Sequence, residues 1–214
     1  MAGGRSRRII AALQVSLDGL IEGPDGEVDW IGSWEDSFDL LPEIDTLVLG
    51  GGAYPGYEQY WMGVLADPQG VQPLTGKAPS QGEVAYARFA DTTPHVVLSR
   101  TLETVAWKTT RIVRDVADIA ALKQQPGKAI HAVGGASLVS TLMNAGLVDQ
   151  LRLTVHPVVL GKGKALFKDV AARHPQAAPG LHPAATAYIR ATTRLPHGAG
   201  RGSRRTTTVQ PASV

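Results

Sequence analysis

Short continuous apolar runs recur between residues 8 and 155, and such runs are typical of strands that are covered on both faces. Segments with apolar residues at helical spacing separate several of these runs. Alternation of the two patterns predicts an α/β fold built on a mainly parallel sheet. The predicted strands are residues 8–15, 45–49, 95–98, 109–113, 130–133 and 151–155.

The predicted helices carry start or stop signals. Trp34, Phe38 and Leu41 recur at helical spacing, and Pro42 would end their helix, whose aromatic residues are expected in the core. The three predicted helices outside the glycine turns are 30–41, 83–89 after a Pro- and Gly-rich surface loop at 63–82, and 116–124 before Pro126-Gly127.

Residues 129–143 combine a strand, a glycine turn and a helix. The apolar run 130–133 meets Gly134 and Gly135, and Ser137 is the expected N-cap of the helix. Paired glycines let a ligand approach the backbone, and a helix N-terminus favours an anion, so this turn is a candidate pyrophosphate site. A plain turn that packs the helix on the strand would have the same sequence. The expected apolar face of the helix holds Leu138, Leu142 and Met143.

Three other strands also end in residues that suit a ligand. Asp18 follows the first strand and would either cap its turn or face a ligand. The second strand runs into three glycines, 50–52, which form either a binding turn or a purely structural one. Ser99 and Arg100 follow the third strand, where a hydroxyl and a guanidinium suit a phosphate monoester, although a single arginine is more often solvated.

Composition narrows the class of protein. The chain has 214 residues, of which 43% are hydrophobic, and this is enough for one core and a single domain. The absence of cysteine excludes disulfides, thiolate metal sites and a cysteine nucleophile. The apolar run at 9–15 is too short for a signal peptide, and no run of about 18 apolar residues could span a membrane. We therefore expect a cytoplasmic protein without a membrane partner.

Charge divides the chain into a basic arm over 1–7, a domain over 8–170 and an atypical segment over 171–214. All acidic residues lie at or before Asp169, so the net charge of +2 hides an acidic body and a basic end, and no nucleic-acid partner is expected. Residues 174–214 contain no acid and show neither strand alternation nor a helical face. This segment is predicted to be a disordered tail or a frameshifted reading of the gene.

Several common enzyme classes lack their motifs here. The sequence contains no Walker A motif, no G-x-S-x-G elbow and no strict G-x-G-x-x-G. The 6 histidines show no metal-ligand spacing, so no metal is expected. His95, His131 and His156 fall in or next to predicted strands, where structural roles are expected.

Seven short segments occur in a familiar order and spacing: 16–19, 26–30, 47–50, 98–100, 133–138, 145–149 and 157–163. With these segments the chain resembles the RibD C-terminal domain family of riboflavin-biosynthesis reductases, within the dihydrofolate reductase-like superfamily. The resemblance covers roughly residues 8–169. It implies a mixed, mainly parallel sheet flanked by helices in three αβα layers, and a homodimer.

The resemblance also implies an enzyme that binds NADPH across the carboxyl edge of the sheet. Asp18 would be its polar catalytic group on the substrate side. The implied cofactor-binding residues are Ala12 under the nicotinamide, Trp30 over the cofactor, Gly50 in the second glycine turn, Ser99 and Arg100 at the 2′-phosphate, and Gly134, Gly135, Ala136, Ser137 and Leu138 at the pyrophosphate.

Departures from the family pattern leave the substrate open. Gly51 stands where an arginine is usual, Val133 stands where riboflavin-pathway reductases usually carry an acid, and a fused zinc deaminase is absent because it would need a Cys-x-x-Cys. The expected function is an NADPH-dependent reductase of a small heterocyclic or ribosylamino-pyrimidine substrate, of the 5-amino-6-(5-phosphoribosylamino)uracil reductase type. Pterin or dihydrofolate reduction, and NADPH binding without catalysis, are the alternatives.

Overall fold

A mainly parallel sheet forms the middle layer of the molecule. The computed structural model describes residues 6–36, 38–173, 186–191 and 207–208. The strands of the main sheet are β1 (Ile9–Ser16), β3 (Ile44–Gly50), β4 (His95–Leu98), β5 (Thr110–Val113), β6 (Ala129–Gly134), β7 (Gln150–His156), β9 (Thr186–Ala191) and β10 (Thr207–Thr208). Their order is β10-β9-β7-β1-β6-β3-β4-β5, with β1 parallel to both of its neighbours. A small second sheet pairs β2 (Leu20–Glu22) with β8 (Lys164–Ala165).

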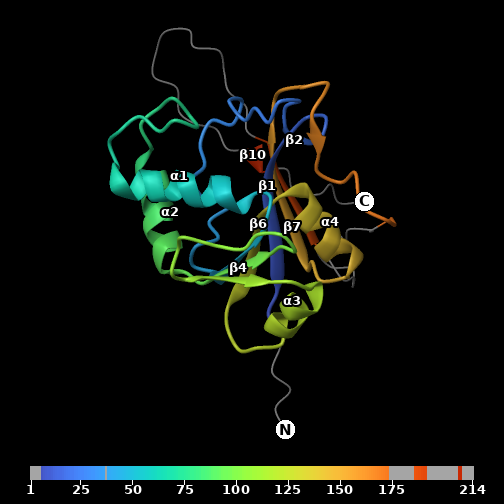
Figure 1. The fold of residues 1–214 in the computed structure, drawn as a ribbon. Helices are drawn as coiled ribbons and strands as arrows, with labels where there is room; N and C mark the ends of the chain where they lie inside the picture. The colour runs from blue at the N-terminus through green and yellow to red at the C-terminus, as the bar shows by residue number, and fades with distance from the viewer. Residues whose placement is uncertain (1–5, 37, 174–185, 192–206, 209–214) are drawn as a thin grey trace.

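Helices cover both faces of this sheet, as Figure 1 shows. On β1, Ile9 and Ala11 belong to the apolar cluster under one pair of helices, whereas Ile10 and Ala12 belong to the cluster under the other pair. The predicted three-layer α/β fold is therefore confirmed, because the central strand is apolar on both faces and needs cover on both. The helices are α1 (Tyr54–Ala66) and α2 (Gln81–Thr92) on one face, and α3 (Val116–Lys123) and α4 (Ala136–Asn144) on the other.

The helix predicted over residues 30–41 does not form in the described part of that segment. The Asp36 carboxylate accepts hydrogen bonds from the backbone N–H groups of Phe38 at 3.3 Å and Leu41 at 2.9 Å. A carboxylate thus takes amide donors that a helix would have given to its own carbonyls. The aromatic residues Trp34 and Phe38 are still partly buried against the cluster under α1 and α2, as expected of core residues.

Helix α1 occupies residues for which the sequence predicted only a glycine turn and the start of a surface loop. It starts directly after that turn, with Pro55 in its first two positions, where a missing N–H costs nothing. The next helix, α2, starts earlier than predicted because of a capping box. The Ser80 hydroxyl accepts the Glu83 N–H at 3.0 Å, and the Glu83 carboxylate accepts the Ser80 N–H at 2.7 Å.

Arg7 ties the strands together at their amino ends. Its side chain is buried and is paired with the Asp45 carboxylate. It also donates to the Thr46 hydroxyl at 2.8 Å and to the Lys128 carbonyl at 2.6 Å. Since these partners belong to β3 or directly precede β6, Arg7 is part of the fold and not of the predicted basic arm. Residues 1–5 of that arm lie outside the described residues.

Two strands are described in the segment where the sequence showed no strand pattern. β9 runs parallel to β7 from Thr186 opposite Gln150 to Ala191 opposite Val155, and β10 pairs with β9 in the antiparallel direction. The rest of the predicted tail beyond Arg173 lies outside the described residues. The predicted domain boundary at residue 170 and the frameshift hypothesis stay predictions.

Candidate active site

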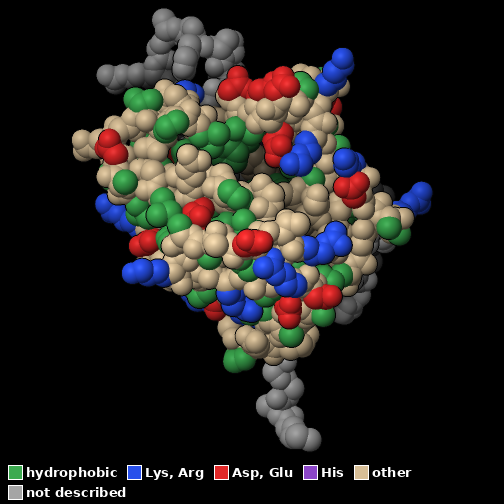
Figure 2. All heavy atoms as spheres, viewed as in Figure 1, with side chains coloured by type: hydrophobic (Ala, Val, Ile, Leu, Met, Phe, Trp, Pro, Cys, Tyr) green, Lys and Arg blue, Asp and Glu red, His purple; other side chains and the backbone are tan. Residues whose placement is uncertain are grey.

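A cavity of about 450 Å³ opens at the carboxyl edge of the sheet, between the residues that follow β1 and the helices α1 and α2. Its floor is made by Ala12 and Leu13 of β1, His131 and Val133 of β6, and Leu49 of β3. Figure 2 shows the opening as a hollow with hydrophobic side chains around it. The cavity therefore lies where ligands bind in open α/β sheets, beyond the carboxyl ends of the strands.

The first glycine turn forms one wall of the cavity. Gly134 and Gly135 both line it, with φ angles of 154° and 88° respectively. Gly135 is the N-cap of α4, and no side chain in the described structure caps this helix. The expectation that Ser137 is the N-cap is wrong, because the helix begins at Ala136, one residue before it. The first amide groups of α4 are thus held at the wall without a side-chain partner.

The second glycine turn packs against the first. A side chain at Gly50 would bring a Cβ to 3.3 Å from the Cβ of Leu138, and one at Gly135 would bring it to 3.5 Å from the Cβ of Ala53. Gly52 and Ala53 line the cavity, and a Cβ on Gly52 would meet open space. The two glycine turns therefore lie side by side, and residues of both line the cavity.

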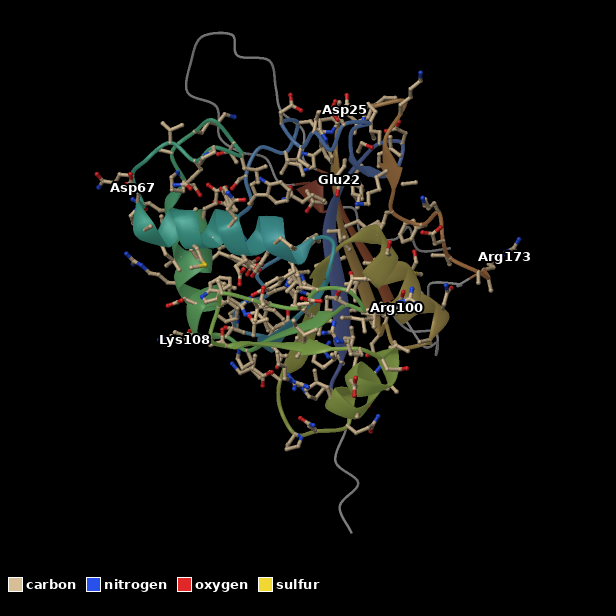
Figure 3. The ribbon with its side chains drawn as sticks, in the orientation of Figure 1. Glu22, Asp25, Asp67, Arg100, Lys108 and Arg173 are labelled. Carbon is tan, nitrogen blue, oxygen red and sulfur yellow. The ribbon has the colours of Figure 1, made fainter. Side chains whose placement is uncertain are left out.

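Ser99 and Arg100 lie one strand further out. A Cβ at Gly51 would collide with the Ser99 side chain, so the exit of β4 adjoins the second glycine turn. The Ser99 hydroxyl accepts the Leu102 N–H at 3.0 Å, and Arg114 donates to the Ser99 carbonyl at 2.7 Å. The Arg100 side chain is exposed, and Figure 3 shows it well separated from Glu22 at the cavity. Neither Ser99 nor Arg100 lines the cavity itself.

The remaining residues of the predicted site are divided between the cavity and its surroundings. Ala12 lies in the floor, whereas Gly50, Ala136, Ser137 and Leu138 adjoin the glycine turns and are not lining residues. Trp30 is half-buried outside the cavity, with its ring edge-on to His156 at 5.3 Å between ring centres. The structure thus brings Ala12, Gly134 and Gly135 to one cavity, and leaves Trp30 beside it.

Asp18 lies outside the cavity and is engaged elsewhere. Its carboxylate accepts hydrogen bonds from the Ser16 hydroxyl at 2.6 Å, the Gly161 N–H at 2.7 Å and the Leu160 N–H at 3.2 Å. These bonds, with the Ser16 hydroxyl first, lower the pKa of Asp18 to about 2. A carboxylate that stays ionised and holds a loop fits a structural role, and this geometry argues against the predicted catalytic one.

Another wall of the cavity consists of aromatic residues that the sequence analysis did not assign to a site. Trp61 and Tyr86 pack with ring centres 4.5 Å apart, and Tyr57 and Tyr60 flank them on α1. The spacing of Tyr57, Tyr60 and Trp61 is that of one helix face, so an α1 prediction would have revealed this wall. All four rings, with Trp34 from the preceding loop, line the cavity.

The charges around the cavity are those of acids. Glu22, Glu35 and Asp36 are among its lining residues.

Two titratable groups of the cavity stay neutral near pH 7. The pKa of Tyr57 is raised well above its ordinary value, mainly by burial and then by the charge and hydrogen bond of Tyr86, so this hydroxyl stays protonated. Burial lowers the pKa of His131 to about 4 and keeps its ring neutral near pH 7. The His131 Nε2 lies 3.3 Å from the Ala12 carbonyl, which can only accept, so Nε2 carries the proton.

Comparison with known proteins agrees with this architecture. The RibD C-terminal domain model matches residues 7–182. The chain belongs to the RibD C-terminal domain family. It is 39% identical over 172 residues to the uncharacterized protein YyaP of Bacillus subtilis (strain 168), covering 79% of this chain and 85% of YyaP. It is also 29% identical over 171 residues to the uncharacterized protein YwjB of that organism, covering 77% of this chain and 84% of YwjB.

Solved structures share the fold of this chain at low sequence identity. A putative riboflavin biosynthesis protein from Shewanella sp. PV-4 superposes with a TM-score of 0.52 at 21% identity, over 78% of this chain and 86% of that one. RibD of Acinetobacter baumannii superposes with a TM-score of 0.50 at 19% identity, over 84% of this chain and 53% of that one. These likenesses show that the chain shares the fold of these two proteins.

Neither a membrane-spanning helix nor a metal-binding cluster is present among the described residues. No helix there has the length and apolar character to cross a membrane. No group of three or more histidine or acidic side chains is arranged there to hold a metal ion.

Proposed function

We propose that this RibD C-terminal domain protein is an NADPH-dependent reductase that acts on a small heterocyclic substrate. The observation that carries the proposal is the cavity itself, which is lined both by two glycine turns and by an aromatic wall. When bound, NADPH would supply the hydride for a C=N or C=O group of the substrate. The chain would supply orientation and a water-poor site.

The two glycine turns and the α4 N-terminus fit the diphosphate part of such a cofactor. Gly134 and Gly135 leave the backbone uncovered at the cavity, and the α4 amides follow directly from Ala136 to Leu138. We infer that these amides hold the pyrophosphate, while Gly50 keeps the second turn close enough to contribute. Any larger residue at Gly135 would fill the gap toward Ala53.

Two further groups would complete the cofactor site. Ser99 and Arg100, beside the second glycine turn, are proposed to bind the 2′-phosphate that distinguishes NADPH from NADH. Ala12, in the floor at the centre of the sheet, is proposed to lie under the nicotinamide because its small side chain leaves room for a flat ring. Since Asp18 lies outside the cavity, water is the proposed proton source for the reduced product.

The test is a binding titration followed by a turnover assay on the full chain. Trp34 and Trp61 line the cavity, so NADPH is expected to quench tryptophan fluorescence, with weaker quenching by NADH at equal concentration. The turnover panel contains 5-amino-6-(5-phosphoribosylamino)uracil, its dephosphorylated form, dihydrofolate and a dihydropterin, and loss of nicotinamide absorbance is the readout. Absence of NADPH binding would reject the proposal. Binding without turnover of any panel member would identify a non-catalytic NADPH-binding protein instead.

A further inference from the structure

We propose that Gln14 and Glu83 are positioning residues of the cavity, which together hold the peptide group between Ser33 and Trp34 and so keep the Trp34 ring in the cavity wall. Gln14 and Trp34 line the cavity, whereas Glu83 is a buried residue of α2 that does not line it. The sequence assigned no role to either positioning residue. Only the turnover measurement that tests this role rests on the proposed function.

Gln14 is a polar residue in the buried strand β1. Side chains alternate between the two faces of a strand, so Gln14 lies on the face of Ile10 and Ala12, which α1 and α2 cover. A buried amide is costly unless both of its ends find hydrogen-bond partners. The Gln14 Nε2 donates to the Ser33 carbonyl at 2.9 Å, and its Oε1 lies 2.7 Å from the His156 Nε2. Both ends of this amide are therefore engaged.

His156 fixes the orientation of the Gln14 amide. The Ser33 carbonyl can only accept a hydrogen bond, so the amide nitrogen of Gln14 faces Ser33 and the amide oxygen faces His156. The His156 Nε2 consequently carries the proton. His156 lies opposite Ser16 in the register of β1 with β7, on the same face of the sheet as Gln14. A neighbouring strand thus directs the donor of Gln14 toward Ser33.

Glu83 holds the same peptide group from its other side. The Glu83 Oε1 accepts the Trp34 N–H at 2.9 Å and the Tyr60 hydroxyl at 3.3 Å, while its Oε2 accepts the Ser80 N–H at 2.7 Å. The Ser33 carbonyl and the Trp34 N–H belong to one planar trans peptide group, so they point in opposite directions. This peptide group is therefore held between a side chain of β1 and a side chain of α2.

The Trp34 ring needs this hold because its own polar atom opposes the position that it takes. The indole Nε1 is buried and has no hydrogen-bond partner among the residues that the structure describes. A buried donor without a partner loses the hydrogen bond that it would make with water. Packing against the apolar cluster under α1 and α2 offsets part of this cost, and the two backbone contacts next to the ring offset more of it.

Hydrogen exchange of the Trp34 N–H in the full chain tests this role. Isotope-labelled tryptophan makes the signal visible by NMR, and Trp34→Phe identifies it by its loss. Gln14→Met removes both amide contacts, whereas Gln14→Glu keeps an acceptor for His156 and removes only the donor to Ser33. Glu83→Gln removes one of two acceptor oxygens. In all three variants we expect the Trp34 N–H to exchange at least about tenfold faster than in the unaltered chain.

Gln72→Met is the matched control. Gln72 is also a buried glutamine, but its Nε2 donates to the carbonyls of Asp67 and Gly70 in the loop between α1 and α2. Exchange of the Trp34 N–H should stay within about twofold of the unaltered chain in this control. Unchanged exchange in the Gln14 variants, or equal acceleration in Gln72→Met, would overturn the proposal. Normal exchange in Gln14→Glu alone would also overturn it, because the contact with Ser33 would then carry no weight.

Turnover distinguishes positioning from catalysis. With a substrate found for the proposed function, Gln14→Met should raise KM about tenfold and change kcat little, because a ligand must then order the loosened wall as it binds. A lower kcat at unchanged KM would assign Gln14 to the chemical step and overturn the positioning role. If NADPH binds but no compound of the panel is reduced, hydrogen exchange decides alone, so a failure of the proposed function is seen separately.

Discussion

The proposed function assigns the preference for NADPH over NADH to a single residue, Arg100, which carries the first prediction. Arg100→Ala is expected to weaken NADPH binding by about 1.5 kcal/mol, because one exposed charge-assisted hydrogen bond to the 2′-phosphate is lost. NADH binding should hardly change, since NADH lacks that phosphate. Calorimetric titration with both cofactors measures the difference. Lys108→Ala is the control, because Lys108 precedes the amino end of β5 at the opposite edge. Equal losses for both cofactors would remove Arg100 from the site.

His131 predicts a pH dependence of stability. Burial lowers its pKa from 6.5 to about 4, so an unfolded chain binds a proton at a higher pH than the folded one. The free energy of unfolding is therefore highest above about pH 6.5. It falls as the pH drops toward 4, by on the order of 3 kcal/mol. Urea unfolding at several pH values measures this slope. His131→Gln should flatten it, and an unchanged slope would assign the effect to other groups, of which buried His95 has a shift in the same direction.

At the scale of elements, the turn between β6 and α4 carries a prediction about binding without loss of fold. Gly135→Val forces a β-branched residue to a φ of 88° and narrows the gap to Ala53, so NADPH binding should be abolished. Backbone strain alone should cost about 1–3 kcal/mol of stability. Gly146→Val, at the other end of α4 with a φ of 65° and open space around it, is the matched control. Fluorescence titration and circular dichroism separate binding from folding, and intact affinity in Gly135→Val would make the turn structural only.

Elements with local signals, including the glycine turn at one wall of the cavity, were predictable from the sequence, whereas the aromatic wall and the loop before Pro42 were not. The central strands β1, β3 and β6 could be predicted because burial on both faces leaves continuous apolar runs, whereas β2, β8, β9 and β10 were not predicted. The loop before Pro42 could not, because Asp36 replaces helical hydrogen bonds with its own carboxylate. Asp18 is a similar case, since its position after β1 pointed to a ligand, whereas its partners Leu160 and Gly161 lie far along the sequence. Only the tertiary fold reveals such contacts.

For the whole molecule, the resemblance to its family predicts a homodimer. Leu17 and Val159 are 61% and 67% exposed, and their loops are joined by the hydrogen bond from the Leu17 N–H to the Val158 carbonyl at 2.8 Å. Two large apolar side chains on adjoining loops form a surface that a second copy could cover. Light scattering at micromolar concentration is expected to give a dimer mass, which Leu17→Lys with Val159→Lys should reduce toward the monomer. Val71→Lys is the control, because Val71 is also an exposed apolar residue but lies on a different loop. A monomer mass for the unaltered chain rejects the prediction.

The contacts of Arg7 with its neighbours affect how this chain can change over evolutionary time. Its contacts with Asp45, Thr46 and Lys128 secure the amino ends of three neighbouring strands, at the edge opposite the cavity. Substitutions of residues that line the cavity, such as Leu74 and Asp36, therefore leave the contacts of Arg7 intact. Proteins that share this sheet can in this way come to bind different substrates at one edge of the sheet while the contacts at the other edge stay the same.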